Sequence, residues 1–256
     1  MKIATWNVNS INVRIPQLIG WLREAEPDVL CVQETKTIDE NFPDGILAEA
    51  GYKTAFTGEK AYNGVAILSK LPIENAQLGF PGDSEDAPKR MIAATVGGVR
   101  IVNTYVPNGS ELWSDKFKFK LDWLIRLRRY FDETCDRHEN VLLCGDFNVG
   151  HYPEDVWNAA AYAGKLHFSK PERAAIEYVR QWGFEDIFRR LNGKIQEFSW
   201  WDYRAGSWQK NQGLRIDHIW TTPSLAATAK SCVIDKSTRE LTLPSDHAPV
   251  IAEFTA

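Results

Sequence analysis

Short apolar runs recur along the 256-residue chain, and their length and bounding turn residues predict β-strands. Polar residues or glycines end most of these runs, so the strands are short and separate. The predicted strands are Ile3–Asn7, Val29–Gln33, Val65–Ser69, Met91–Val96, Arg100–Thr104, Val141–Gly145, Arg215–Trp220, Ser231–Ile234 and Val250–Phe254.

Helical patterns separate the strands in at least three places. Apolar residues recur at helical spacing between positions 15 and 22, where Pro16 suits the first turn of a helix. A second helix is predicted over about 116–135. A third follows Ser169, which stands three residues before Glu172, the spacing of a capping box. This alternation predicts an α/β chain with helices outside a sheet core.

Composition allows one substantial core, because 44% of the residues are hydrophobic. Candidate chemical motifs lie near both ends and in the middle of the chain, and no linker, low-complexity tract or internal repeat divides it. We therefore expect a single domain over residues 1–256.

The cysteines and the N-terminus indicate an intracellular protein. None of Cys31, Cys135, Cys144 and Cys232 forms a C-x-x-C pair, which disfavours both a zinc site and a disulfide framework. The first apolar run is too short for a signal peptide, and no stretch approaches the roughly 20 apolar residues that span a bilayer. We expect a cytoplasmic protein with no membrane partner.

The net charge of −4 argues against nonspecific binding of polyanions by the whole surface. Local basic groups can still contact phosphates, because screening limits exposed charges to a reach of about 8–10 Å. Lys116, Lys118 and Lys120 alternate with phenylalanines at the start of the second predicted helix. We interpret most of that helix as having a solvated charged face, with these three lysines as candidate phosphate contacts.

Polar side chains lie at or beside five of the predicted strands. A carboxylate and an amide two residues apart at a strand end point the same way, because side chains alternate along extended backbone. Any one such group is typical of a turn, but five in one chain indicate a shared site. The groups are Asn7 to Ser10, Gln33 to Thr35, Asp146 to Asn148, Asp217, and Ser245 to His247.

Together these motifs make the chain resemble the exonuclease III family of abasic-site endonucleases, in the endonuclease/exonuclease/phosphatase superfamily. The resemblance covers nearly the whole chain; it also includes Tyr62–Ala66, Asn103–Gly109 and Leu214–Asp217. It implies a four-layer α/β sandwich, two packed mixed β-sheets flanked by helices, with the site at one edge. It further implies a monomeric DNA repair nuclease that hydrolyses phosphodiester bonds at abasic sites and at blocked or recessed 3′ ends of double-stranded DNA.

The resemblance also implies a Mg²⁺ site, with Mn²⁺ as a substitute. Hydrolysis of an anionic phosphodiester benefits from a divalent ion, and Mg²⁺ prefers oxygen ligands. Glu34 is the leading ligand, with Asn7 and Asp246 as neighbours. The full candidate set for holding metal and phosphate is Asn7, Glu34, Asp146, Asn148, Asp246 and His247.

The candidate catalytic residues are Tyr105, Asp146, Asn148, Asp217 and His247. Two mechanisms remain open. In one, Asp217 orients His247 as the general base; in the other, a protonated His247 binds the phosphate while Asp146 activates water, with Asn148 holding that water. We favour the second, because a nearby aspartate stabilises the imidazolium. Tyr105 would donate to the phosphate.

The resemblance implies an apolar pocket for the sugar flipped out at a missing base. Trp200, Leu214 and Ile216 are its candidate wall, and Asn63 and Asn108 are further candidate DNA contacts. Individually weak candidates for contacts with the DNA backbone are Arg215, Arg204, Lys210, Arg90 and Lys36.

One residue departs from the family pattern. Where the family has a small residue two positions before the capping Ser or Thr, this chain has His167. An imidazole near the sugar pocket would block an internal abasic nucleotide and still accept a frayed 3′ end, which predicts a specialised 3′-end-processing enzyme. The alternative is a surface histidine on a variable loop.

Two other kinds of protein in this superfamily have some of the same motif residues. A lipid or inositol phosphatase of the same superfamily would use the same Asp, Asn and His residues, but the whole-chain motif agreement and the tryptophan-rich segment around Trp200 argue against it. A non-catalytic regulatory relative would have lost motif residues, whereas Glu34, Asp146, Asp217 and His247 are all present.

Overall fold

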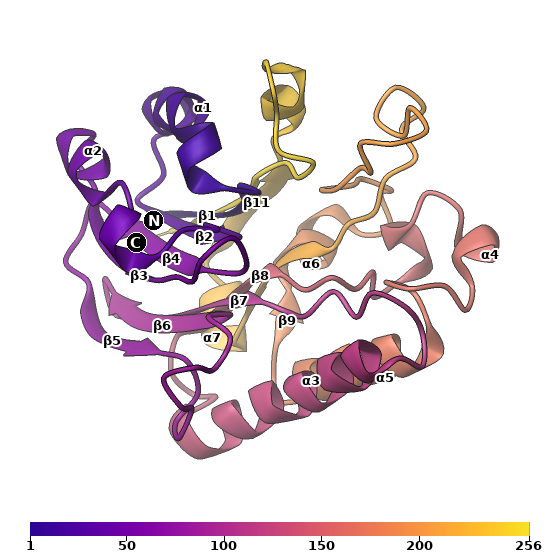
Figure 1. The fold of residues 1–256 in the computed structure, drawn as a ribbon. Helices are drawn as coiled ribbons and strands as arrows, with labels where there is room; N and C mark the ends of the chain where they lie inside the picture. The colour runs from indigo at the N-terminus through magenta and orange to yellow at the C-terminus, as the bar shows by residue number, and fades with distance from the viewer. Residues whose placement is uncertain (256) are drawn as a thin grey trace.

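The computed structural model describes residues 1–255 and places two six-stranded β-sheets face to face (Figure 1). In spatial order, the first sheet is β11 (Ala229–Ile234), β12 (Val250–Phe254), β1 (Lys2–Asn7), β2 (Val29–Gln33), β4 (Val65–Ser69) and β3 (Lys53–Thr57). The second is β5 (Glu74–Leu78), β6 (Met91–Val96), β7 (Val99–Tyr105), β8 (Val141–Asp146), β10 (Asp217–Thr221) and β9 (Glu185–Asp186).

Both sheets are mixed. The β1–β2 pair and the β7–β8 pair are parallel, and the other pairs are antiparallel. Strands β1, β2 and β4 of the first sheet lie against β8, β7 and β6 of the second. The apolar side chains between them, such as Ile3, Ile67, Ile101 and Leu142, form the central core.

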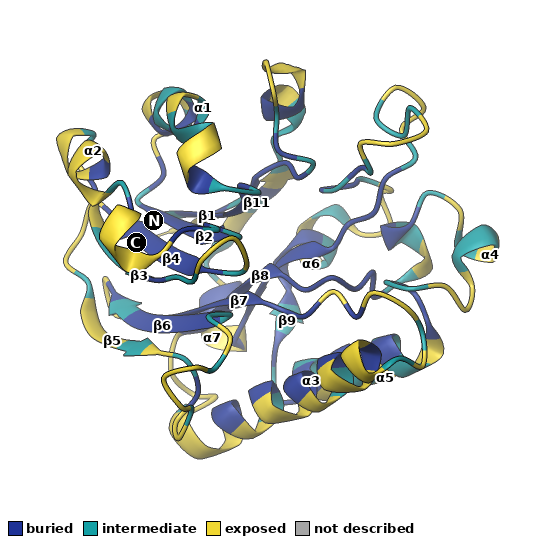
Figure 2. Ribbon diagram, in the orientation of Figure 1, coloured by how far each residue is buried: buried dark blue, intermediate teal, exposed yellow. Residues whose placement is uncertain are grey.

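Helices cover both outer faces, so the predicted four-layer α/β sandwich is confirmed. Helices α1 (Ile11–Ala25) and α2 (Asp44–Glu49) pack on the first sheet, and α3 (Asp115–Thr134) and α5 (Lys170–Arg180) pack on the second. Their inner faces are buried and their outer faces exposed (Figure 2). The shorter helical segments are α4 (Ala159–Tyr162), α6 (Ile187–Asn192), α7 (Pro223–Ala226), η1 (Asp39–Asn41), η2 (Pro153–Asp155) and η3 (Lys236–Glu240). The extent of one domain over 1–256 stays a prediction.

The apolar runs located most strands, and the exceptions have local causes. Strands β3, β5 and β9 were missed because they are edge strands with polar sequences, Lys-Thr-Ala-Phe-Thr, Glu-Asn-Ala-Gln-Leu and Glu-Asp. The predicted strand over 215–220 begins at Asp217 instead, because Arg215 and Ile216 run outside the ladder.

The prediction of a helix start at Pro16 was wrong. Helix α1 begins at Ile11, so Pro16 lies inside it. Proline removes one backbone donor from the helix and leaves the carbonyl of Asn12 without its partner. Asn12 and Pro16 are both exposed, so that carbonyl faces water. The capping box of α5 is confirmed, since Ser169 and Glu172 each accept from the other's backbone N–H.

All four cysteines are free thiols in the structure. Within residues 1–255, no helix combines the length and the apolar character that crossing a membrane requires.

The loop after β8 buries a neutral imidazole. His151 is 4% exposed, and burial lowers its pKa to about 4 although nearby Glu177 acts in the opposite direction. The ordinary pKa of histidine in an unfolded chain is about 6.5. Between these values the unfolded chain takes up a proton that the folded protein does not, so folding stability falls as the pH falls.

We therefore predict that His151→Gln flattens the pH dependence of stability between pH 7 and pH 4. The wild type should lose roughly 2–3 kcal/mol more unfolding free energy over this interval than the variant, as measured by urea denaturation. His138→Gln is the control, because His138 is exposed. Equal slopes for wild type and His151→Gln would contradict the prediction.

Candidate active site

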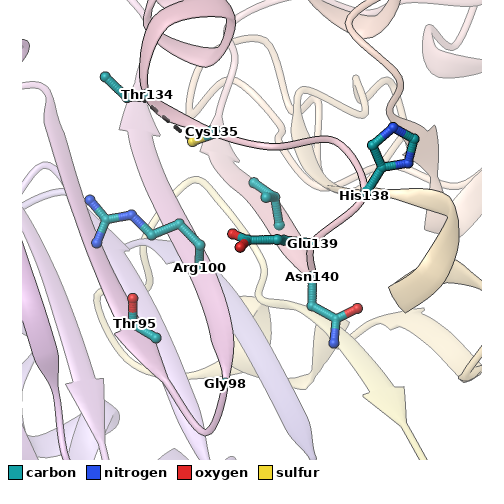
Figure 3. A pocket seen from close by; sticks show the side chains of 9 residues that line it. Thr95, Gly98, Arg100, Thr134, Cys135, His138, Glu139 and Asn140 are labelled. Atoms are coloured by element: carbon teal, nitrogen blue, oxygen red, sulfur yellow. Dashed lines mark hydrogen bonds between the residues drawn. The ribbon is translucent and has the colours of Figure 1, made fainter.

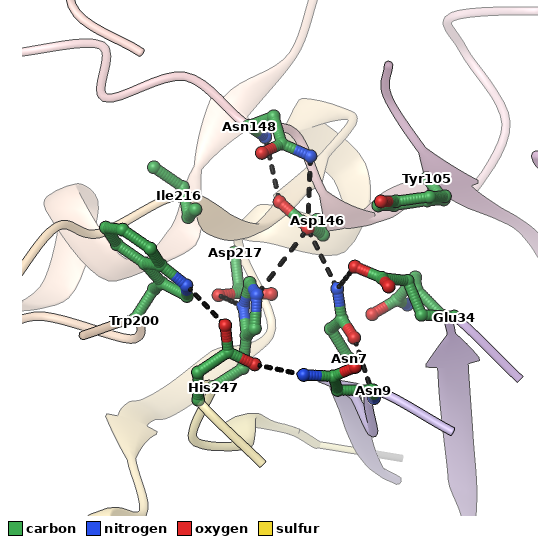
Figure 4. Close-up of polar contacts among 12 residues, drawn as sticks. Asn7, Asn9, Glu34, Tyr105, Asp146, Asn148, Trp200, Ile216, Asp217 and His247 are labelled. Carbon is green, nitrogen blue, oxygen red and sulfur yellow. Dashed lines mark hydrogen bonds and ion pairs between the residues drawn. The ribbon is translucent and has the colours of Figure 1, made fainter. Parts of the chain in front are cut away.

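The ends of strands from both sheets converge on one polar site (Figure 4). Asn7 ends β1 and Glu34 follows β2 in the first sheet. Tyr105 ends β7 and Asp146 ends β8, where the two residues are register partners in the second sheet. Asp217 begins β10 and is paired with Asp146. Parallel pairing within each sheet, and contact between β1 and β8, bring these ends together.

Asn7 joins the two sheets at this point. Its Nδ2 donates to Glu34 Oε1 at 2.9 Å and to Asp146 Oδ2 at 3.0 Å. Ser245 Oγ donates to the carbonyl oxygen of Asn7 at 2.7 Å and links the β1 end to the loop of His247. One buried amide therefore sets the spacing between the two carboxylates.

Asp146 is held from two further directions. The backbone N–H of Asn148 donates to its Oδ1 at 2.8 Å, and Asn148 Nδ2 lies 3.2 Å from its Oδ2. Asn108 Nδ2 in turn donates to Asn148 Oδ1 at 3.2 Å, so the predicted contact residue Asn108 belongs to the site.

His247 and Asp217 form a buried pair. His247 Nδ1 lies 2.9 Å from Asp217 Oδ2, and its Nε2 lies 3.8 Å from Asp146 Oδ2. Burial alone would lower the pKa of His247, but the carboxylates of Asp217 and Asp146 raise it to about 10. Burial raises the pKa of Asp146 to about 7, against the opposing effect of His247. The arrangement favours a protonated imidazole facing Asp146.

Three residues have the donor chemistry for a divalent ion. One ligand atom from each of Glu34, Asp146 and His247 lies within 4.8 Å of the others. Two carboxylates suit a cation such as Mg²⁺ or Mn²⁺. Asp246 lies outside this group; its oxygens accept from Trp200 Nε1 and Asn9 Nδ2, both at 2.9 Å.

Tyr105 faces the same cluster with its hydroxyl protonated. The side chain is buried, and burial together with the charges of Glu34 and Asp146 raises its pKa well above the ordinary value. The guanidinium of Arg90 stacks 4.7 Å from the centre of its ring and donates to its carbonyl oxygen at 3.3 Å. Arg90, predicted as a DNA backbone contact, thus supports Tyr105.

The predicted apolar wall is present beside His247. Leu214 and Ile216 are fully buried and pack with the partly buried Trp200. Trp200 pairs by isolated β-bridges with both Leu214 and His247. The Trp200 ring centroid is 6.0 Å from that of His167 and 6.4 Å from that of His247. Trp200 is therefore the accessible face, and Leu214 and Ile216 lie beneath it.

Two of the predicted phosphate contacts were wrong because their side chains are buried. Arg215 is 1% exposed; its Nε lies 2.8 Å from Asp155 Oδ1 and its Nη2 lies 2.7 Å from Asp186 Oδ2. Lys120 is 0% exposed and pairs with Glu172 at 2.5 Å.

The remaining basic candidates and Asn63 lie at the surface or are engaged elsewhere. Lys36 Nζ contacts Glu34 Oε2 at 2.6 Å, and Lys118 pairs with Asp122. Asn63 donates to Glu59, outside the catalytic cluster. Lys116 is exposed, Arg204 pairs with Asp202, and Lys210 donates to the carbonyl of Ala205.

Sequence reasoning gave no role to two residues that the structure joins to the site. Asn9 accepts from Lys36 Nζ and donates to Asp246. Ser199 Oγ donates to Asp217 Oδ2 at 2.6 Å and accepts from the backbone N–H of Asp217. Asn9 follows Asn7 at strand spacing, which is a usable signal, whereas nothing local in the sequence links Ser199 to Asp217.

A second polar cavity lies at the opposite ends of β7 and β8, away from these residues (Figure 3). Arg100 and Val141, near the starts of these strands, line it with Cys135 and His138. Arg100 donates there to Asn75 and Gln77, and Tyr105 and Asp146 lie at the other strand ends. The catalytic candidates are therefore confined to one edge of the sandwich.

Comparison with known families decides the assignment. Residues 4–247 match the endonuclease/exonuclease/phosphatase family. The chain belongs to this family. It is 36% identical to exodeoxyribonuclease III of Haemophilus influenzae, over 99% of this chain and all of that protein. This relative places the chain in the exonuclease III branch.

Solved structures agree across the full length. An AP endonuclease from Archaeoglobus fulgidus superposes with a TM-score of 0.96 at 37% identity, covering 100% of both chains. The 3′-5′ exonuclease NExo from Neisseria meningitidis superposes with a TM-score of 0.97 at 41% identity, again covering 100% of both chains. A second structure of NExo, described as a 3′ phosphatase, is bound to a product DNA hairpin.

We predict that Glu34→Gln weakens binding of Mn²⁺ at least tenfold, because it removes one of two carboxylates from the ligand group. Titration calorimetry or Mn²⁺ electron paramagnetic resonance measures the dissociation constant without any activity assay. Glu253→Gln is the matched control, since Glu253 is exposed on β12. An unchanged dissociation constant in Glu34→Gln would place the metal elsewhere.

Proposed function

We propose that this protein is a DNA repair nuclease that acts preferentially on 3′ ends of duplex DNA and only weakly on internal abasic sites. Its class, a phosphodiesterase of the DNA repair type, follows from its family and full-length relatives. Those relatives include an AP endonuclease and a 3′-5′ exonuclease at similar identity, so the preference is argued from this chain's own residues.

The observation that carries the preference is the position of His167. Its ring faces Trp200 across 6.0 Å, and its Nδ1 lies 2.7 Å from the carbonyl oxygen of Asn148. The ring thus stands between the catalytic loop and the accessible face of the apolar wall. The sugar of an internal abasic nucleotide is joined to the DNA strand on both sides, so it must be flipped into the space that His167 occupies. A nucleotide at a 3′ end is joined on one side only and can enter without displacing the His167 ring.

Residues of the site bind the metal ion and activate the water that hydrolysis requires. Glu34 and Asp146 would hold a divalent ion, Mg²⁺ or Mn²⁺, which would supply charge neutralisation for the phosphate. Asp146 accepts the proton of the attacking water, which Asn148 orients.

Other groups hold the phosphate. The protonated His247 binds a phosphate oxygen, with Asp217 fixing its ring, and Tyr105 donates its hydroxyl to a second oxygen. Asn7 fixes the relative positions of Glu34 and Asp146.

The remaining parts of the proposal are the contacts with DNA, the oligomeric state and the cellular compartment. Trp200, lying over Leu214 and Ile216, contacts the deoxyribose at the cleaved position, and Asn108 and Asn63 contact nearby backbone. The protein works as a monomer on double-stranded DNA in the cytoplasm.

The first experiment compares two substrates with one enzyme. We expect the wild type to remove a 3′ phosphate from recessed duplex DNA with a kcat/KM at least tenfold above that for incision at an internal abasic site, with both activities abolished by EDTA. His167→Gly should raise internal incision about tenfold, roughly 1.4 kcal/mol of transition-state stabilisation. His138→Gly, in the polar cavity, should leave both rates unchanged.

The same assay separates the alternatives. Equal rates on both substrates in the wild type, unaffected by His167→Gly, would contradict the preference. Activity on inositol phosphates or phospholipids without activity on DNA would support a phosphatase, and metal-independent DNA binding without cleavage would support a regulatory relative.

The choice of base gives a separate prediction. In His247→Gln, the rise of kcat/KM with pH should persist, because Asp146 remains the proton acceptor. Its midpoint should move to higher pH, since the imidazolium lowers the pKa of Asp146 in the wild type. Substrate affinity should fall because one phosphate contact is lost. A pH–rate profile in which the rising limb disappears would identify His247 as the base.

A further inference from the structure

A buried ion pair lies directly behind His167. Lys120 on α3 and Glu172 on α5 are both 0% exposed, and their Nζ and Oε1 atoms are 2.5 Å apart. Neither side chain reaches solvent, so neither contacts DNA directly.

Each N–H donor of Lys120 has a hydrogen-bond partner in Glu172 or in the loops that carry Asn108 and Asn148. Besides Glu172, its Nζ donates to the carbonyl oxygen of Asn108 at 3.0 Å and to that of Asn148 at 2.8 Å. An ammonium group has three N–H donors, so all are used. Lys120 thereby fixes the two loops that carry Asn108 and Asn148.

Glu172 fixes the His167 segment in the same way. Its Oε1 accepts from the backbone N–H of His167 at 3.0 Å, and its Oε2 accepts from Ser169 N and Oγ at 3.0 and 2.6 Å. His167 has a φ of 70°, a left-handed conformation that non-glycine residues rarely adopt. The carboxylate therefore stabilises a backbone geometry that this residue would otherwise avoid.

The two loops also meet through the imidazole itself. His167 Nδ1 lies 2.7 Å from the carbonyl oxygen of Asn148, which is the same oxygen that accepts from Lys120. A carbonyl oxygen only accepts hydrogen bonds, so Nδ1 carries a proton. Burial, then the nearby ammonium of Lys120, lower the pKa of His167 to about 4. The ring is thus neutral at pH 7, with an unprotonated Nε2.

We propose that the Lys120–Glu172 ion pair is a positioning device that holds His167 in one orientation and one tautomer, and so sets the preference for 3′ ends over internal abasic sites. This inference rests on the proposed function. It assigns a role in specificity to two residues that touch neither DNA nor metal.

Packing between the helices does not by itself require these charges. Helices α3 and α5 already contact through apolar residues such as Leu127, Ile176 and Val179. A buried ion pair is often no more stabilising than an apolar pair of the same volume. What an apolar pair would lack is the set of hydrogen bonds to Asn108, Asn148 and His167.

The test uses the double variant Lys120→Met/Glu172→Gln, which removes both charges at nearly constant volume and leaves no unpaired buried ion. Glutamine at position 172 retains a capping-box residue for α5. Arg128→Met is the matched control. Arg128 also joins α3 to α5, through the carbonyl of Tyr178, but it lies eight residues, roughly 12 Å, along the helix from Lys120.

Two readouts are measured on each protein. The first is the ratio of kcat/KM for internal abasic incision to kcat/KM for 3′-phosphate removal, which a uniform loss of folded enzyme does not change. The second is the nitrogen chemical shifts of ¹⁵N-histidine-labelled protein, in which the His167 signals are assigned by their absence from His167→Gly.

We expect the ratio to rise at least fivefold in the double variant and to stay at the wild-type value in Arg128→Met. The nitrogen shifts should report a single Nδ1–H tautomer for His167 in the wild type and a mixture of tautomers in the double variant. On a His167→Gly background the double variant should add no further change in the ratio.

The possible failures are distinguishable. If His167→Gly shifts the ratio and the double variant does not, the positioning role is wrong and the proposed function stands. If His167→Gly leaves the ratio unchanged, the proposed preference is wrong; an unchanged His167 tautomer in the double variant would then overturn the positioning role as well. Should the double variant not fold, Lys120→Gln/Glu172→Gln, which likewise leaves no unpaired buried ion, is measured with the same criteria.

Discussion

The site depends on packing two sheets so that an acidic residue from each comes close to the other. Glu34 follows the first sheet and Asp146 ends the second, and the amide of Asn7 donates to both. Two carboxylates at this separation repel each other. Asn7, the imidazolium of His247 and a bound divalent ion all reduce that repulsion, and the last two are also groups that bind phosphate. The groups that reduce the repulsion between Glu34 and Asp146 are therefore also the groups suited to binding a phosphate.

Much of this could be predicted from the sequence, because catalytic groups at strand ends follow directly from apolar runs. Asn7, Glu34, Asp146 and Asp217 each stand at or beside the end of a run, and the sheet order then brings them together. His247 lies on a loop before a strand; the polar group Ser245 to His247 marked it, but its role required the family resemblance. The edge strands β3, β5 and β9 were not predicted because an edge strand does not require an apolar sequence.

Buried charges were the residues that sequence reasoning misplaced. Lys120 and Arg215 occur in contexts typical of exposed basic residues, a charged helix face and a strand start. Their burial depends on Glu172, Asp155 and Asp186, which are 29 to 60 residues away along the chain. No local pattern encodes such a partner. Neither side chain reaches the surface. Lys120 donates to the carbonyl oxygen of Asn148, and Arg215 is paired with Asp155 and Asp186.

His167 and His247 both lie near Trp200, in different charge states, and the difference comes from the groups that surround each ring. Carboxylates of Asp217 and Asp146 face His247 and raise its pKa to about 10, whereas burial and the ammonium of Lys120 lower that of His167 to about 4. Near neutral pH one ring is a cation and the other is uncharged; in the proposed function the first binds phosphate and the second obstructs the sugar pocket. In that proposal, catalysis and substrate selection each use a histidine, in different electrostatic surroundings. A substitution behind one ring then alters one function and leaves the other ring in place.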